Sequence, residues 1–294
     1  MINMLEKKLL IIGAEKPGPS TEMLIKEAKE KFSNVLYAPV NQIVLKLGKD
    51  YIMNYNGIDL KDFDYCLPRI DALRAQYGFH VIRFMDLVGM NKPYSAQAIL
   101  IAHNKFYSLE QMKKADVPVP ETYMVTSKET SKKLLDNVKY PVIIKLVDGF
   151  GGRGVMLAED KESALSVIET LKLMDRQIII EEFLESSGED IRAFIVGGEI
   201  VAGMKRKAKK GDFRSNLFSG GKASYYTITG ELKDIALRAA AASNSDIIAI
   251  DMIETKDGPK VIEINLNPGI KGIQKVAHTN ITKRIIDFIV DEIA

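Results

Sequence analysis

The sequence of 294 residues contains one cysteine, three histidines and no tryptophan. The lone Cys66 excludes an internal disulfide and any metal site that needs several cysteines. It lies in an apolar segment without a nearby histidine, so we interpret it as a buried, inert thiol. The histidines show no metal-like spacing, and no Ser/His/Asp arrangement typical of hydrolases is present. Chemistry that depends on these residue types is therefore not expected.

The sequence also lacks long apolar runs and a strong net charge. Its N-terminal run, Leu9–Ile12, is too short for a signal-peptide core or a membrane span, and it is interpreted as a buried strand. The formal net charge of +2 provides no overall attraction for nucleic acid or a membrane surface. Hydrophobic residues make up 46% and charged residues 27% of the chain, as in ordinary soluble enzymes. We therefore expect a cytoplasmic protein without a membrane partner.

Alternating strand-like and helical segments predict the fold of the N-terminal part. Apolar runs at Lys8–Ile12, Val35–Ala38 and Tyr65–Pro68 alternate with a helical stretch at Thr21–Lys31. This order indicates an α/β domain with a parallel sheet. Proline disfavours helix in the residue before it, so Lys92-Pro93 marks a predicted domain boundary.

Two further lobes are predicted after this boundary. In the central lobe, a helix at Asn104–Ala115 precedes strands at Tyr140–Val147 and Val155–Ala158, a helix capped by Asp160 and a strand at Gln177–Phe183. The third lobe is predicted to contain hairpins at 191–204 and 247–266 and helices at 231–242 and from residue 282. The predicted domains are residues 1–93, 94–187 and 188–294, in a mixed α/β and α+β fold.

The second predicted hairpin of the third lobe carries the strongest functional signal. Centring its turn on Asp257-Gly258 places Asp251 opposite Glu263 to within one residue of register, and side-chain alternation puts Glu263, Asn265 and Asn267 on one face. Two acids that face each other in apolar strands repel. Mg²⁺ would remove this repulsion, because it binds carboxylate and amide oxygens together with phosphate oxygens. The alternative is a pair of acids that simply faces solvent.

A glycine-rich segment, GFGGRG at residues 149–154, is the second signal. No Gly-Lys-Ser/Thr follows it, and a strand rather than a helix comes next, which excludes a P-loop and a dinucleotide fingerprint. A strand, a glycine loop and a second strand form a flap whose backbone N–H groups close over phosphates. The residues expected there are Gly151, Gly152 and Gly154. The alternative is a flexible hairpin turn.

Two lysines and a strand end complete the predicted nucleotide site. Lys145 lies inside an apolar strand, where an ammonium must reach solvent or meet an anion such as a triphosphate. Lys105, at the start of a helix, is a plausible second phosphate contact or else an ordinary surface lysine. The strand 178–180 continues into Glu182-Phe183 and is predicted to offer a hydrophobic edge with free backbone groups, which suits adenine.

Basic residues suggest where an acidic substrate would bind. The run from Lys205 to Arg214 fits an acidic substrate better than nucleic acid, because stacking aromatics are few. A solvated edge strand guarded by lysines is the alternative for this run. Arg69, at a predicted strand end, could add a carboxylate clamp from the first lobe, although an arginine at such a place is often structural.

With these features in order, the sequence resembles the ATP-grasp superfamily and, more closely, RimK-type α-L-glutamate ligases. The stretches that carry the resemblance are GFGGRGVMLAED, SGEDIRAFIVGGEIVAGMKRKAKKGDFRSNL, IDMI and VIEINLNPGIKGIQK. The resemblance extends from Lys105 to the C-terminus, whereas the first lobe matches only through its α/β pattern and its PRI segment. It implies a three-lobed ATP-grasp architecture with an N-terminal pre-ATP-grasp domain, and a homo-oligomer, either a dimer or a tetramer.

The resemblance also implies residue roles. Lys105 and Lys145 would hold ATP phosphates, the backbone of Glu182 and Phe183 would hold adenine, and Asp190 would face the ribose. The other implied site residues are Arg214, Ser215 and Asn216 between nucleotide and substrate, and Asp251, Glu263 and Asn265 as ligands of two Mg²⁺ or Mn²⁺ ions. In this scheme Arg214, Lys145 and Arg69 would contact the reacting groups.

The resemblance has two departures that leave the second substrate open. Asn267 stands where these ligases often have serine, and the segment between the strand end at 182–183 and Asp190 is one residue shorter. Asn-x-Asn resembles relatives that act on amino-group carrier proteins.

The expected activity is an ATP-dependent carboxylate–amine ligation through an acyl phosphate, which releases ADP and phosphate. L-glutamate or a similar amino acid would be added to an acidic acceptor. The acceptor would be a ribosomal protein C-terminus, a tetrahydromethanopterin or deazaflavin coenzyme with a glutamyl tail, or an amino-group carrier protein. A small-molecule kinase and a nucleotide-gated nucleic-acid-binding protein are the alternatives from other classes.

Overall fold

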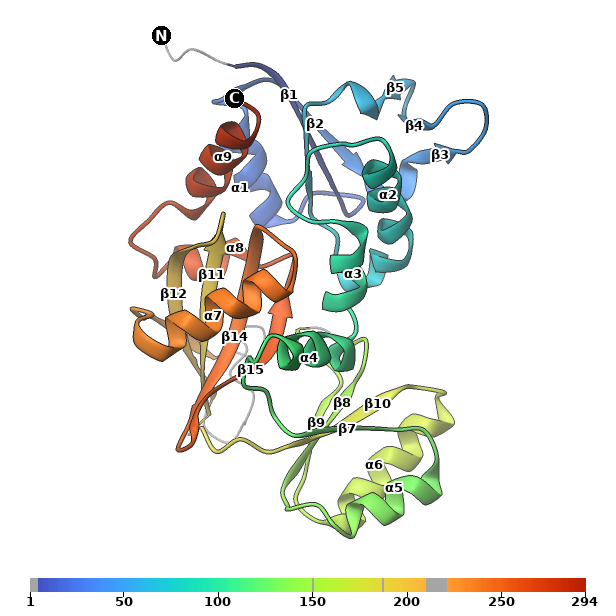
Figure 1. Cartoon of the computed structure of the whole chain (residues 1–294), viewed down its shortest axis with the longest axis vertical. Coiled ribbons are helices and arrows are strands. Elements are labelled where there is room, and N and C mark those ends of the chain that lie inside the picture. The colour runs from blue at the N-terminus through green and yellow to red at the C-terminus, as the bar shows by residue number, and fades with distance from the viewer. Residues whose placement is uncertain (1–4, 150, 187, 210–220) are drawn as a thin grey trace.

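The computed structural model of the protein describes residues 5–149, 151–186, 188–209 and 221–294. Three units follow one another along the long axis of the molecule (Figure 1). We call residues 5–102 the N-terminal domain, 122–182 the central lobe and 189–265 the C-terminal lobe. No helix among the described residues is long and apolar enough to cross a membrane.

The N-terminal domain is built on a parallel sheet, as predicted. Its strands β1 (Leu5–Gly13), β2 (Phe32–Pro39) and β6 (Tyr65–Pro68) lie in the order β2-β1-β6, and both neighbours of β1 are parallel to it. The carboxyl ends of these strands therefore meet at one edge, the place where open α/β sheets bind ligands. The strand at Tyr65–Pro68 has the predicted bounds.

Helices cover both faces of this sheet. Because side chains alternate along β1, Leu9 and Ile11 pack with helices α1 (Pro19–Ala28) and α9 (Ile281–Glu292), whereas Leu10 and Ile12 face the opposite core. That second core includes helices α2 (Ala75–Leu87) and α3 (Ala96–Ala102). The C-terminal helix α9 lies beside α1 at the top of the molecule (Figure 1).

A small antiparallel sheet projects from this domain and was not predicted. It consists of β3 (Val44–Lys46), β4 (Ile52–Tyr55) and β5 (Ile58–Asp59). Its strands are short, and their sequence lacks a regular apolar alternation. Single 3-10 turns at Val40–Gln42, Leu60–Asp62 and Ala72–Arg74 connect the elements around it.

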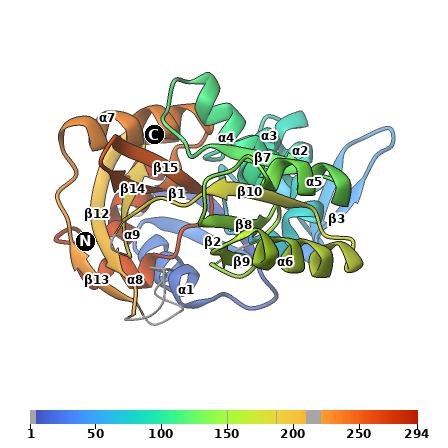
Figure 2. The ribbon, with the colours of Figure 1, turned by 90° about the horizontal axis from the view of Figure 1, so that it is seen from below.

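The central lobe is a four-stranded antiparallel sheet with helices on one side. The strands are β7 (Thr122–Val125), β10 (Ile178–Glu182), β8 (Val142–Leu146) and β9 (Val155–Ala158), in that order. Helices α5 (Lys128–Leu135) and α6 (Lys161–Leu173) run alongside them (Figure 2). Asp160 caps α6 in a capping box with Ser163, which confirms the predicted helix start. Helix α4 (Lys105–Lys114) leads into this lobe.

The C-terminal lobe is a five-stranded antiparallel sheet in the order β13-β12-β11-β14-β15. The bounds are β11 Glu189–Val196, β12 Glu199–Lys207, β13 Lys222–Tyr225, β14 Ile247–Thr255 and β15 Gly258–Asn265, with helices α7 Gly230–Ala242 and α8 Ile270–Gln274. Both predicted hairpins are present, β11–β12 and β14–β15. Strand β12 lies between β11 and β13, so Lys205, Arg206 and Lys207 lie inside the sheet, and the alternative of an edge strand is wrong for these three residues.

The apolar cores show how the units are joined. The N-terminal domain and the C-terminal lobe share two cores, in which Leu10 and Ile12 pack with Ile191 and Ile195, and Leu9 and Ile11 pack with other C-terminal residues. The central lobe has a separate core around Ile144 and its neighbours. Among the described residues no shared apolar core joins the central lobe to the C-terminal lobe, and a cavity lies between the two.

Candidate active site

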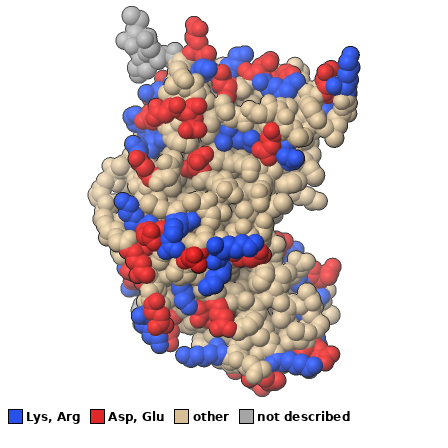
Figure 3. Space-filling view, in the orientation of Figure 1, with Lys and Arg blue, Asp and Glu red and all other residues tan. Residues whose placement is uncertain are grey.

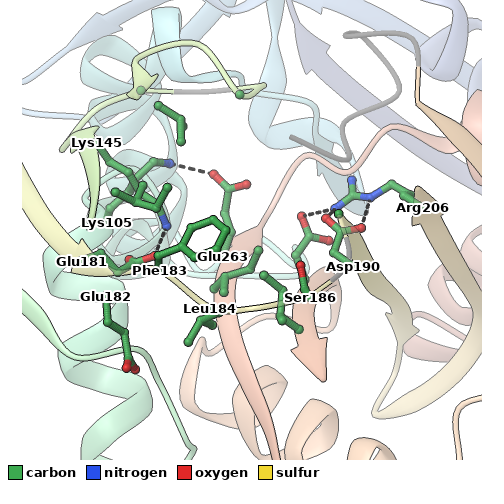
Figure 4. A pocket seen from close by; sticks show the side chains of 18 of the residues that line it. Lys105, Lys145, Glu181, Glu182, Phe183, Leu184, Ser186, Asp190, Arg206 and Glu263 are labelled. Atoms are coloured by element: carbon green, nitrogen blue, oxygen red, sulfur yellow. Dashed lines mark hydrogen bonds and ion pairs between the residues drawn. The ribbon is translucent and has the colours of Figure 1, made fainter. Parts of the chain in front are cut away.

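A cavity of about 350 Å³ lies between the central lobe and the C-terminal lobe (Figure 4). This volume falls in the range of small-molecule sites, roughly 300–1,000 Å³. Apolar side chains from both lobes, such as Ile143, Val155 and Ile262, line it together with charged ones. Several of the residues predicted from the sequence line this cavity together with the glycine segment: Lys105, Lys145, Glu182, Phe183, Asp190, Asp251 and Glu263.

Lys145 forms the central-lobe wall with Glu181. Lys145 lies on β8 and its ammonium forms an ion pair with the carboxylate of Glu181 on β10. Both side chains are buried, with 9% and 3% of each residue exposed. The expected anion for Lys145 is therefore present within the protein. Glu181 Oε2 has no partner among the described residues, so the pair is not fully satisfied.

The glycine segment joins β8 to β9, as predicted for a flap. Gly151, Gly152 and Gly154 have φ values of +60°, +76° and +74°, which residues other than glycine rarely adopt. A Cβ on Gly154 would lie 2.7 Å from the side chain of Leu146. Gly149 and Gly152 line the cavity, whereas Gly151 and Gly154 shape the turn beside it.

The strand end predicted to bind adenine differs from the prediction in one respect. Strand β10 pairs with β7 and β8 on its two sides, so it is not an edge strand. The backbone N–H of Glu182 donates to the carbonyl of Glu121 at 2.9 Å. The Glu182 carboxylate points away from the other labelled side chains and binds Lys260 (Figure 4). Backbone groups for adenine are thus expected from Phe183 onward, where the strand has ended.

Asp251 and Glu263 form the opposite wall, and their register is the predicted one. They are directly paired across β14 and β15, next to a bulge in the ladder. Asp251 is 1% exposed, and Arg192 donates to its two oxygens at 2.7 and 2.6 Å. Arg206 lies 3.1 Å from the same carboxylate. Burial alone would raise the pKa of Asp251, but Arg192 and Arg206 lower it below its usual range.

Arg206 connects Asp251 to Asp190. It donates to the two oxygens of Asp190 at 2.6 and 2.5 Å, and both residues are buried (Figure 4). Burial opposes the charge of Arg206, yet the two carboxylates raise its pKa above the ordinary value. The carboxylate of Asp190, which was expected to face the ribose, is therefore held by an arginine.

Lys105 holds Glu263 at a distance of 2.7 Å between Nζ and Oε1. The backbone N–H of Lys105 donates to the carbonyl of Val147, so the start of α4 is also fixed to the end of β8. The Asn265 side chain lies 3.3 Å from Asp251 Oδ2, which brings all three predicted metal ligands together. Asn265 does not line the cavity itself.

These residues fit a divalent ion that arrives with phosphates rather than one held by protein alone. The described residues contain no group of three His, Cys, Asp or Glu side chains that could hold a metal. Mg²⁺ commonly takes one or two carboxylates and completes its shell with water and phosphate oxygens. The repulsion argument from the sequence is corrected, because Arg192, Arg206 and Lys105 already neutralise the two facing acids.

Other predicted residues lie elsewhere. Arg214, Ser215 and Asn216 are outside the described residues. Arg69 does not line the cavity, and its guanidinium donates to the carbonyl of Pro268 at 2.9 Å. Two lysines of the basic run have acidic partners, since Lys207 pairs with Glu189 at 2.8 Å and Lys205 with the same residue at 3.5 Å.

Arg192, Arg206 and Glu181 are the site residues that the sequence did not predict. Arg192 pairs across strands with Asp251, but the two residues are 59 positions apart in the sequence. Arg206 was noted only as part of a basic run. The sequence signal for Arg192 is a charged residue inside an apolar strand, the same signal that predicts an anion beside Lys145.

Comparison with known proteins shows the class first. The fold is that of solved ATP-grasp proteins. A RimK domain ATP-grasp protein from Sphaerobacter thermophilus superposes with a TM-score of 0.74 at 20% identity, over 95% of this chain and 98% of that one. The ATP-grasp ligase PsnB, in a structure with Mg, ADP and a phosphomimetic minimal precursor, gives 0.76 at 16% identity over 99% and 100%.

The family is more specific. Residues 8–99 match the RimK PreATP-grasp domain family, and residues 102–289 match the RimK-like ATP-grasp domain family. A probable alpha-L-glutamate ligase of Legionella pneumophila is 36% identical over 261 residues, 88% of this chain and 85% of the relative. The chain belongs to the RimK-like ATP-grasp family. It is therefore an ATP-dependent ligase that joins a carboxylate to an amine.

Proposed function

We propose that the protein adds L-glutamate, or a similar amino acid, to an acidic acceptor and uses ATP with Mg²⁺ or Mn²⁺. The observation that carries this proposal is that one cavity is lined by the flap and Lys145 on one side and by Asp251 and Glu263 on the other. Relatives named probable alpha-L-glutamate ligase, from Legionella pneumophila and Nitrosococcus oceani, support it. The PsnB structure with Mg and ADP supports the same ligands.

In this proposal the residues around the cavity bind and orient the nucleotide. Lys145 and Lys105 exchange their present partners, Glu181 and Glu263, for phosphate oxygens. The flap places backbone N–H groups over the phosphates and excludes water, which would otherwise hydrolyse a reactive intermediate. Two divalent ions, held by Asp251, Glu263 and Asn265, would neutralise charge that develops on the transferred phosphoryl group.

The reaction then needs no protein nucleophile. A carboxylate oxygen of the acceptor forms a bond to the γ-phosphorus as the bond to ADP breaks, giving an acyl phosphate and ADP. The amine of the amino acid attacks the acyl carbon, phosphate leaves with the electron pair of the broken C–O bond, and the nitrogen loses a proton. The product is an amide. Arg214 is proposed to lie near the reacting carboxylate.

The nucleic-acid alternative receives no support from the described residues. Lysines and arginines are interspersed with acids on the face shown in Figure 3 and do not gather in one basic field. The kinase alternative is separated by product analysis, because a kinase would form a stable phosphorylated product without an amine.

An ADP-release screen of amino acids against candidate acceptors tests the proposal. The acceptors are a ribosomal protein C-terminal peptide, a coenzyme with a glutamyl tail and an amino-group carrier protein. We expect ADP and phosphate formation that requires both partners, and a product heavier by one amino-acid unit in mass spectrometry. ADP formation that needs no amine and leaves a stable phosphorylated acceptor, without free phosphate, would refute the ligase proposal. Light scattering will measure the mass of the protein in solution and so test the predicted homo-oligomer.

A further inference from the structure

The segment that follows the predicted metal-binding strand is held by the N-terminal domain. Strand β15 ends at Asn265, and the chain continues through Asn267 and Pro268 into helix α8. Two side chains from the N-terminal domain reach this segment. The residues in each contact are far apart in the sequence: Arg69 and Pro268 are 199 positions apart, and Ser20 and Ile270 are 250 positions apart.

Arg69 makes the first contact. It directly follows β6, and its backbone N–H donates to the Ile12 carbonyl at 2.7 Å, which fixes it at the carboxyl edge of the parallel sheet. Its guanidinium donates to the Pro268 carbonyl at 2.9 Å and is 6% exposed beside the buried Tyr94. Burial lowers the pKa of Arg69 to about 10, which leaves it protonated at neutral pH. Burying a charged group is costly unless the group is paired or hydrogen-bonded, so the contact with Pro268 offsets part of the cost of burying Arg69.

Ser20 makes the second contact, from the first turn of α1. Its hydroxyl accepts hydrogen bonds from the backbone N–H groups of Ile270 at 2.9 Å and Lys271 at 3.2 Å. These groups begin helix α8, which has no cap from its own N-cap residue Gly269. Ser20 therefore supplies from another domain the acceptor that a helix start normally finds nearby.

We infer that the N-terminal domain positions the metal-binding end of β15 through Arg69 and Ser20. The two contacts hold residues 268–271, immediately beyond Asn265, while Asn265 contacts Asp251 at 3.3 Å. Arg69 is thus a positioning residue and not the carboxylate clamp expected from the sequence. The inference rests on the proposed function only in that it takes Asp251, Glu263 and Asn265 as metal ligands.

The physical reason is that metal ligation tolerates little displacement. Groups that orient metal ligands without touching the metal typically change metal affinity by about 10–100-fold when they are removed. Only Leu266 and Asn267 lie between Asn265 and Pro268, so a shift of the Pro268 carbonyl is transmitted along a short, proline-stiffened segment. A lysine at position 69 keeps the charge but lacks the planar fork of the guanidinium.

The test measures Mn²⁺ binding directly, in the presence of a non-hydrolysable ATP analogue, by the electron paramagnetic resonance signal of free Mn²⁺. We expect Arg69→Lys to weaken Mn²⁺ binding by about tenfold and Ser20→Ala to weaken it by a smaller factor. The affinity for ADP without metal should stay within about twofold of wild type in both variants, because neither residue touches the cavity. If Arg69→Lys fails to fold, the Mn²⁺ affinity of Ser20→Ala still tests the inference.

Two matched controls remove similar contacts far from β15. Arg238→Lys removes another arginine that donates to a carbonyl between segments, that of Asp116 at 2.7 Å. Ser163→Ala removes another serine at a helix start, in the capping box of α6. Both should bind Mn²⁺ as wild type does.

The outcomes separate the two proposals. Wild-type Mn²⁺ affinity in Arg69→Lys and Ser20→Ala, together with a lower melting temperature, would mean that these residues only dock the domains, and it would overturn the inference. The proposed function would stand in that case. A wild-type protein that binds no Mn²⁺ with the nucleotide would overturn both.

Discussion

Asp251→Asn and Glu263→Gln should both abolish ligation but should differ sharply in stability. Asp251 is enclosed by Arg192 and Arg206, whose side chains are 14% and 4% exposed. Removing one partner of a buried ion pair costs about 3–5 kcal/mol, because a charge is left buried without compensation. Arg206 retains Asp190, and the asparagine oxygen still accepts a hydrogen bond, so we expect the lower end, about 3 kcal/mol.

Glu263 lies in a different environment. Its side chain is 30% exposed and has one cationic partner, Lys105, which is itself 13% exposed. Ion pairs with this much solvent access contribute about 0–1 kcal/mol. Glu263→Gln should therefore remain close to wild-type stability while it loses one proposed metal ligand.

Thermal unfolding and ADP release measure the two effects separately. One kcal/mol shifts the melting temperature by roughly 2–4 °C in a chain of 150–250 residues. We expect a decrease of about 6–12 °C for Asp251→Asn and of less than about 4 °C for Glu263→Gln. Glu199→Gln, which removes an exposed ion pair with Arg284, is the control and should behave as wild type in both assays.

Two results would contradict this reasoning. Equal melting temperatures for Asp251→Asn and wild type would show that the arginines do not depend on the carboxylate for their burial. Near-normal turnover in either variant would refute the metal assignment.

Three further predictions concern the same cavity. Because Arg192 and Arg206 depress the pKa of Asp251, the stabilisation that this carboxylate gives the folded state is complete above its ordinary pKa of 3.8 and is lost as pH falls below that value. The free energy of unfolding should therefore fall less steeply below about pH 4 in Asp251→Asn than in the wild type. Chemical denaturation at several pH values will measure this difference. Lys145→Met should lose ATP binding and be destabilised by about 3 kcal/mol because Glu181 stays buried, whereas the added change Glu181→Gln should restore much of the melting temperature but not the binding. Recovery of ATP affinity in that double variant would exclude Lys145 as a phosphate ligand. Gly154→Ala should raise the KM for ATP about tenfold, since its positive φ and the crowded space beside it distort the flap, and Gly198→Ala, equally strained but in open space on another hairpin, should leave the KM unchanged.

Local patterns in the sequence predicted the elements and the register of one hairpin. The strand at Tyr65–Pro68, the cap at Asp160 and the flap between β8 and β9 depend on residues within a few positions of one another. The pairing of Asp251 with Glu263 followed because a short turn joins their strands and fixes which residues face each other.

The small sheet β3–β5 and the interior place of β10 could not be predicted in the same way. Strand β10 reads as an apolar run with a polar end whether it lies at an edge or between two neighbours. Which neighbours it has depends on β7 and β8, which are about fifty and thirty residues away.

The sequence by itself determined that this protein has an α/β domain, a glycine flap and facing acids on a hairpin, because each is encoded by spacing along a short stretch of chain. Only the tertiary structure decided which charges those acids meet. Arg192 reaches Asp251 because β11 pairs with β14, and Arg69 reaches Pro268 because the N-terminal domain shares its core with the C-terminal lobe. Burial makes such long-range pairings strong, since charges withdrawn from water must be balanced by whichever partners the folded chain brings within reach.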